Sequence, residues 1–561
     1  MHDLVIRGAR IVDGTGARSR QGDLAVMGGR IAEVGGSLGR AKREIDADGL
    51  ALAPGIVDPH THYDAQLTWD AAARPSVELG VTTIAIGNCG FGIAPCRPAD
   101  RDRTLASLTQ VEGMPLEALR AGTRWEFETY PEFLAFLERH GVVPNVAGYC
   151  GHSTIRTWVM GEDASRRAAR DDEIAKMRSI LGEALAAGAI GFSTSTFEGH
   201  NGEGGVPMPS RLAEEAELRA LNRALGESGR GHFMLTKGAH TTIGFLESLA
   251  AESSRPMFIA ALLEDNLNPG RALAELEEIG QAQARGRRLY GMVGCSPMTM
   301  DFTLASAYPF EILAAWTPAI ALYRDKSGLH QLYRDRAFRD AVRGELERGV
   351  REREFTPQWD KLDLVKAAKP ENERLEGRTV GALASEAGRD PLDWFLDFGV
   401  DEDCRTQFSV DILNADDASV KPLLAHPYST VALSDAGAHL TLFCDAGFGL
   451  YMLAHWARDL GAFTLEAAVA KLTAVQARAF RIPDRGRLAP GCWADLLLFD
   501  PATVGRGPKR RVRDLPGGAH RLTTPALGVH GVFVNGEQAV DGNGLIEGHG
   551  RPGRLLRAFD S

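Results

Sequence analysis

The stretch GIVDPHTHYD, residues 55–64, ends a short apolar run with two histidines two positions apart. Side chains alternate along a β-strand with a period of two, so a strand here projects His60 and His62 to the same face. Two neutral imidazoles side by side form half of a site for a divalent metal. The stretch therefore predicts both the first strand of a sheet and a place where metal ligands gather.

Downstream of this stretch, apolar β-branched runs alternate with helical patterns. GVTTIAIGNCG (80–90), PNVAGYCGHS (144–153) and STVALSDAG (429–437) are typical of buried strands. Residues 171–188 carry apolar side chains at helical spacing. About eight such strand–helix units predict an α/β fold with a parallel sheet closed into a (β/α)8 TIM barrel.

The two ends of the chain carry a different pattern. Glycine-punctuated β signals such as GARIVDG (8–14) and GVFVNGEQAV (531–540) predict strands of one sheet. We expect residues 1–54 and 481–561 to build one small β-domain, into which the barrel of residues 55–480 is inserted. Long connections at about 91–140 and 296–425 are expected over the barrel mouth, where binding loops concentrate.

Composition restricts the class of protein. The net charge of −11 over 561 residues argues against a broad nucleic-acid surface. No apolar run reaches the ~18 residues of a membrane span, and no signal peptide is evident. Seven scattered cysteines without a CxxC pair indicate a reducing compartment, so we expect a cytoplasmic protein. Its expected partner is a small-molecule substrate. The long connections could supply an interface between the subunits of a homo-oligomer.

Two further residues are candidates for the other half of the metal site. Asp435 ends the last predicted strand and Cys89 ends the second. Closure of a barrel makes its first and last strands neighbours, so both residues are expected near His60 and His62. The alternative for Asp435 is an ordinary aspartate in a turn, and the alternative for Cys89 is a small buried apolar residue. His152 also follows a predicted strand, where it could ligate a metal or hydrogen-bond a substrate carbonyl.

The motifs APGIVDPHTH, GVTTIAIGNCGF, LSDAGAH and RGRLAPGCWADLLLFDP, in this order, resemble the amidohydrolase superfamily. More narrowly, the chain resembles the N-acyl-D-amino-acid deacylases, or D-aminoacylases. The resemblance implies a β-sandwich from both termini and a distorted barrel that holds zinc. It also implies that His60, His62, Cys89 and Asp435 surround the metal.

The sequence departs from the family where two further histidines should end two middle strands. It has GHFMLTKGAH, with Lys237, at the first place, and PMFIAALLEDN at the second. A carbamylated Lys237 could act as an anionic ligand, or Glu264 or Asp265 could supply a carboxylate. The third interpretation, which we favour, is a single metal held by His60, His62 and Asp435, with or without Cys89.

The predicted function is a metal-dependent amidohydrolase that cleaves the amide bond of an N-acyl-D-amino acid, or a similar small N-acyl compound, with metal-activated water. Zn²⁺ is the expected metal, with one ion per chain; two ions and another divalent metal remain alternatives. Asp435 is the expected base and His152 the group that helps to stabilise the oxyanion. Arg156, Arg211 and Lys237 are candidates to bind the substrate carboxylate. The alternatives are hydrolysis of a cyclic amide or another C–N bond, and a non-catalytic ligand-binding descendant.

Overall fold

A computed structural model describes residues 1–202, 205–265, 268–311, 313–348, 358–440, 444–548 and 550–559. The chain divides into two compact units. The first contains residues 1–262, 274–296 and 423–561, and the second contains residues 263–273 and 297–422.

Eight parallel strands curl into a distorted barrel in the first unit, as predicted. Almost all of their residues are buried, because each strand is covered on one face by helices and on the other by the barrel interior. In order along the sheet they are β6 (Ile56–Asp58), β7 (Val81–Ile86), β8 (Asn145–Gly151), β9 (Gly191–Ser195), β10 (His232–Thr236), β11 (Met257–Ala260), β12 (Leu289–Val293) and β17 (Ser429–Val431).

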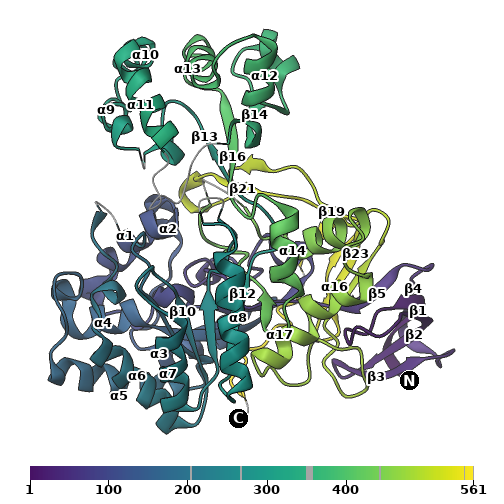
Figure 1. Cartoon of the computed structure of the whole chain (residues 1–561). Coiled ribbons are helices and arrows are strands. Elements are labelled where there is room, and N and C mark those ends of the chain that lie inside the picture. Colours follow the sequence, from purple (N-terminus) through teal and green to yellow (C-terminus); the bar gives the residue numbers. More distant parts are fainter. Residues whose placement is uncertain are drawn as a thin grey trace. The chain divides into compact units, whose positions relative to one another are not determined.

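Helices follow most of these strands and lie outside the sheet (Figure 1). The helix predicted at residues 171–188 begins at Asp171 as expected and ends at Ala186, two residues before Gly188, which has a φ of +105°. The helices that lie wholly in the first unit include α3 (Tyr130–His140), α4 (His152–Met160), α5 (Asp171–Ala186), α6 (Glu215–Ser228), α7 (Ile243–Ser253), α15 (Phe448–Tyr451), α16 (Leu465–Leu472) and α17 (Ala474–Ala479). Two others, α8 (Arg271–Ala284) and α14 (Asp417–Ala425), contain residues of both units. The long connection at 91–140 adds α1 (Arg101–Val111) and α2 (Leu116–Gly122).

Strands from both ends of the chain form one nine-stranded sheet, which is the predicted β-domain. The two ends meet where Ala53 pairs antiparallel with Leu497. Its core is aliphatic and includes Ile6, Leu52 and Leu496. The N-terminal strands are β1 (His2–Ile11), β2 (Arg20–Met27), β3 (Arg30–Gly35), β4 (Ala41–Asp46) and β5 (Ala51–Pro54), and the C-terminal strands are β18 (Leu496–Phe499), β23 (Val529–Val534), β24 (Glu537–Asp541) and β25 (Gly544–Leu545).

The second unit contains most of the connection predicted at 296–425, of which residues 312 and 349–357 lie outside the described part. A four-stranded sheet packs against helices through aromatic side chains such as Phe302, Phe310 and Phe395. Its strands are β13 (Met298–Phe302), β14 (Leu362–Lys366), β15 (Arg378–Thr379) and β16 (Gln407–Leu413), and its helices are α9 (Thr317–Ile320), α10 (Lys326–Arg334), α11 (Arg336–Arg348), α12 (Val380–Glu386) and α13 (Pro391–Asp401).

All seven cysteines are buried and unbridged. Across the described ranges, no helix combines the length and the apolar character that a bilayer span requires.

A buried aspartate ties the β-domain to the barrel. Asp495, which precedes β18, is 3% exposed. Its carboxylate accepts hydrogen bonds from Nδ2 of Asn145 on β8, at 3.2 Å from each oxygen, and from the backbone N–H of Asn535 at 2.9 Å. The guanidinium of Arg485 completes the set of partners. One carboxylate therefore joins segments from three distant parts of the chain.

Asp495→Asn should destabilise the protein by about 3–5 kcal/mol, because it leaves the buried Arg485 guanidinium without a counter-charge. The measurement is the urea unfolding midpoint. Asp484→Asn is the matched control, since Asp484 pairs with Arg30 at an exposed site and should change the midpoint little. Equal midpoints for the two variants would contradict the role given to Asp495.

Candidate metal centre

Four side chains from three barrel strands converge at the carboxyl ends of β6, β7 and β17. Cys89 Sγ lies 3.4 Å from His60 Nε2 and 3.9 Å from His62 Nε2. Asp435 Oδ1 lies 3.1 Å from His60 Nε2 and 3.6 Å from His62 Nε2. The donor atoms of His60, His62 and Cys89 all lie within 4.8 Å of one another.

Burial and charge are unevenly distributed within this cluster. The side chains of His60 and His62 are 2% and 6% exposed, whereas that of Asp435 is 16% exposed. Burial alone would lower the pKa of His60, but the neighbouring Cys89 and Asp435 raise it to about 9. Burial opposes ionisation of Asp435, yet the two imidazoles hold its pKa well below the usual value. Cys89 and Asp435 thus favour a positive charge at the place where the four side chains meet.

These residues fit a divalent metal. Two imidazole nitrogens, one sulfur and one carboxylate oxygen form a donor set typical of zinc. The thiol of Cys89 is prepared for this role, because His60 and His62 lower its pKa against the effect of burial. The Oγ1–H of Thr236, at the end of β10, also donates to Cys89 Sγ at 3.1 Å.

The loop after β17 is held against β6 by hydrogen bonds. Ser434 Oγ donates to Asp58 Oδ2 at 2.5 Å and to the His60 carbonyl at 3.2 Å. The backbone N–H of His62 donates to the Ala436 carbonyl at 2.8 Å. Gly437 has a φ of +92°, and a Cβ there would lie 2.7 Å from the carbonyl carbon of His62. Only glycine permits this approach, which places Asp435 beside the two histidines.

Glu112, just after α1, supports His62 from the other side. Its Oε1 lies 3.0 Å from His62 Nδ1, and the carboxylate is 2% exposed. A carboxylate at the second ring nitrogen fixes the tautomer of a ligating histidine and leaves Nε2 free to bind a metal. Together with the other anionic neighbours, Glu112 raises the pKa of His62 well above its ordinary value, although burial acts in the opposite direction.

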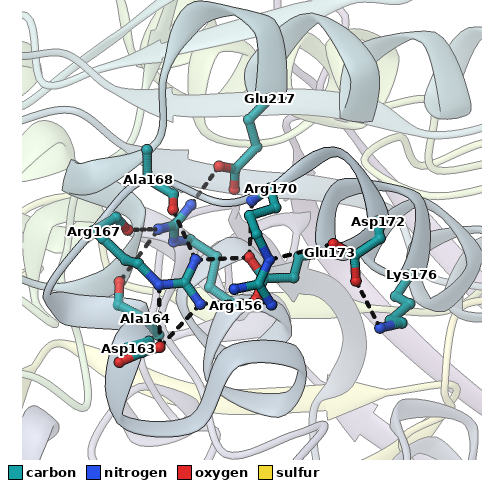
Figure 2. A network of polar contacts seen from close by, with 10 residues as sticks. All are labelled: Arg156, Asp163, Ala164, Arg167, Ala168, Arg170, Asp172, Glu173, Lys176 and Glu217. Atoms are coloured by element: carbon teal, nitrogen blue, oxygen red, sulfur yellow. Dashed lines mark hydrogen bonds and ion pairs between the residues drawn. The ribbon is translucent and has the colours of Figure 1, made fainter.

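Arg156 and Glu217, both buried, belong to a separate network of polar contacts (Figure 2). His152, which is also buried, contacts the same Glu217. His152 Nε2 lies 2.8 Å from Glu217 Oε1, and its Nδ1 lies 2.8 Å from Thr194 Oγ1. Arg156 pairs with the other oxygen of Glu217 and donates to the Arg167 carbonyl at 2.9 Å. Since protein groups occupy both ring nitrogens of His152 and two nitrogens of Arg156, these contacts lend no support to the predicted catalytic and substrate-binding roles.

Lys237 is also outside the donor cluster. Its Nζ lies 3.1 Å from Glu275 Oε1 on α8 and 3.5 Å from the Gly238 carbonyl, so the predicted role as a metal ligand has no support in these contacts. Glu264 Oε1 accepts the backbone N–H of Gly270 at 2.8 Å within the second unit. Arg211 lies on the loop after β9, where Nη1 donates to the His200 carbonyl at 3.3 Å and to the side chain of Asn201.

Sequence reasoning missed Glu112, Glu217 and Thr236. Glu112 belongs to the QVEGMPLEAL phrase, in which no spacing marks one acid as special. Glu217 is one of several acids at the start of α6 and is the one that faces inward. Thr236 directly precedes Lys237, and its position at a strand end was the one available signal.

Comparison with known proteins identifies the family of the chain. The model of the amidohydrolase family matches residues 43–301 and 347–540. The D-aminoacylase of Alcaligenes xylosoxydans xylosoxydans is 30% identical over 96% of each chain. A solved D-aminoacylase, described by its binuclear metal centre, has a TM-score of 0.67 and 27% identity over all of both chains. The N-acyl-D-glutamate deacylase of Bordetella bronchiseptica, solved with zinc and a phosphonate inhibitor, has a TM-score of 0.66 and 26% identity over 99% of this chain and all of its own.

Glu217→Gln should destabilise the protein by about 3–5 kcal/mol, because it leaves the buried Arg156 unpaired, and should leave the bound metal per chain unchanged. Urea unfolding and metal analysis measure the two effects. Glu227→Gln is the control, since Glu227 pairs with Arg178 at an exposed site. Loss of metal from folded Glu217→Gln protein would place this network in the metal centre instead.

Proposed function

Since the chain belongs to the amidohydrolase family, we propose that it is a metal-dependent deacylase of N-acyl-D-amino acids. The observation that carries this proposal is the convergence of His60, His62, Cys89 and Asp435 at the carboxyl end of the barrel, where active sites of this fold lie. The substrate class comes from the relatives, among which are a D-aminoacylase and an N-acyl-D-aspartate deacylase, the latter 29% identical over this whole chain.

We propose that these four residues hold one zinc ion per chain. A bound divalent metal supplies Lewis acidity, which lowers the pKa of water and polarises a carbonyl oxygen. The middle strands β10 and β11 end in Thr236 and Ala260, which offer no imidazole for a second ion.

Asp435 has the position of a general base. It is the most exposed member of the cluster, so it can reach a water molecule or a substrate. The imidazoles keep it ionised, so it can accept a proton from the attacking water at its carboxylate. The same carboxylate can then donate that proton to the amide nitrogen as the C–N bond breaks.

The substrate's own carboxylate requires a basic partner, because burying an unpaired carboxylate is costly. Arg211 is the candidate that the contacts favour over Arg156. Its guanidinium is anchored at Nη1 on the loop after β9 and is partly exposed, whereas Arg156 is fully buried beside Glu217. The unbridged cysteines suit a reducing compartment, and we propose a cytoplasmic enzyme.

The test is hydrolysis of matched N-acetyl-D- and N-acetyl-L-amino acids, with neutral and acidic side chains. Purified protein should release the amino acid from D substrates only, lose activity on dialysis against a chelator and regain it with Zn²⁺. Metal analysis should give about one zinc per chain. Hydrolysis of the L series alone, or full activity without metal, would contradict the proposal.

Asp435→Asn should lower kcat by about 10²–10⁴-fold, because an amide cannot accept the proton of water. The variant should stay folded, since the group is small and partly exposed, and should retain metal through His60, His62 and Cys89. Arg211→Met is the companion variant and should raise KM more than it lowers kcat. A wild-type kcat for Asp435→Asn would exclude Asp435 as the base.

A further inference from the structure

Cys89 is presented by a turn that the chain does not adopt easily. Gly87, Cys89 and Gly90 have φ values of +76°, +57° and +79°. A left-handed conformation is unfavourable for a residue other than glycine, so surrounding groups must hold Cys89 in it.

The hydroxyl of Ser193, on β9, is inserted into this turn. Its Oγ–H donates to the Gly87 carbonyl, and the same oxygen accepts the backbone N–H of Gly90 at 3.1 Å. The carbonyl of the first residue and the N–H of the fourth are the two groups that a β-turn often joins directly. Here the serine hydroxyl lies between them, and Ser193 is 0% exposed.

Other contacts fix the first half of the turn. Asp64 Oδ2 accepts the N–H of Gly87 at 2.9 Å, and Asn88 Nδ2 donates to the carbonyls of Thr61 and Ala85 at 3.2 and 2.9 Å. A Cβ on Gly90 would lie 2.9 Å from Thr194 Cα, so the backbone of the second half lies directly on β9. Ser193 is therefore placed to set the geometry of the half that carries Cys89.

We propose that Ser193 is a positioning residue that directs the Cys89 thiolate to the metal held by His60 and His62. This inference rests on the proposed function, because it takes Cys89 as a metal ligand. Without the hydroxyl, the Gly87 carbonyl and the Gly90 N–H would remain buried and unpaired, or would bond directly and rotate the peptide between them. Either change moves Sγ relative to the two imidazoles.

The experiment replaces the native metal with Co²⁺, whose charge-transfer absorption in the near ultraviolet reports a thiolate–metal bond. Wild-type protein should show this band, and Cys89→Ser should abolish it. Ser193→Ala should lose most of the band and bind Co²⁺ at least tenfold more weakly, while the visible d–d bands of the bound ion persist. Ser429→Ala is the control, since Ser429 is a buried barrel serine whose hydroxyl donates to the backbone at His426.

Ser193→Thr and Ser193→Val form a matched pair that differs only in the hydroxyl, so they decide the question if Ser193→Ala does not fold. The threonine variant should keep the band and the valine variant should lose it. Full bands in both Ser193→Ala and Ser193→Val would overturn the inference and leave the metal centre intact. A wild-type protein without the band, or a band that survives Cys89→Ser, would instead contradict Cys89 as a ligand and the proposed centre with it.

Discussion

The junction of the first and last barrel strands is the contact on which the site depends. Strands β6 and β17 share no ladder; a single parallel bridge joins Thr61 to Ala436. A hydrogen bond from Ser434, in the loop after β17, to Asp58 on β6 joins the same two segments. Burial raises the pKa of Asp58 to about 7 even though Ser434 and the backbone at His60 favour its ionised form. The residues that close the barrel thus flank the residues that form the donor cluster.

Because the donor cluster brings several charged groups together, other side chains must hold each donor in its position. Glu112 fixes one imidazole, Thr236 donates to the sulfur, and Ser193 spans the turn of Cys89. None of the three is in the donor set, and each comes from a different part of the chain. The donors themselves are short side chains at strand ends, where the sheet limits their movement. Precise placement of a reactive group requires such supporting contacts, because a small displacement weakens catalysis strongly.

The sequence predicted the barrel and the donor cluster because both follow from local patterns. His60 and His62 share a face by strand alternation, and barrel closure brings Asp435 to them. The supporting contacts could not be predicted, because nothing local distinguishes Glu217 from the other acids of its helix or Ser193 from Ser195. The contacts of His152 and Arg156 illustrate the same limit. A strand end places a residue near the site, but only the tertiary structure reveals that Glu217 already occupies both side chains.

The pairing of Ala53 with Leu497 has a consequence for biosynthesis. Strands β1 to β5 can pair among themselves as soon as they emerge, but β18, the partner on the other edge of β5, is translated only after the barrel. At 5–20 residues per second, the ribosome needs roughly 20 to 90 s to synthesise the chain between them. During that interval β5 presents an unpaired edge, which is a site for association with other nascent chains. The β-domain therefore begins before the barrel is translated and is completed only after it.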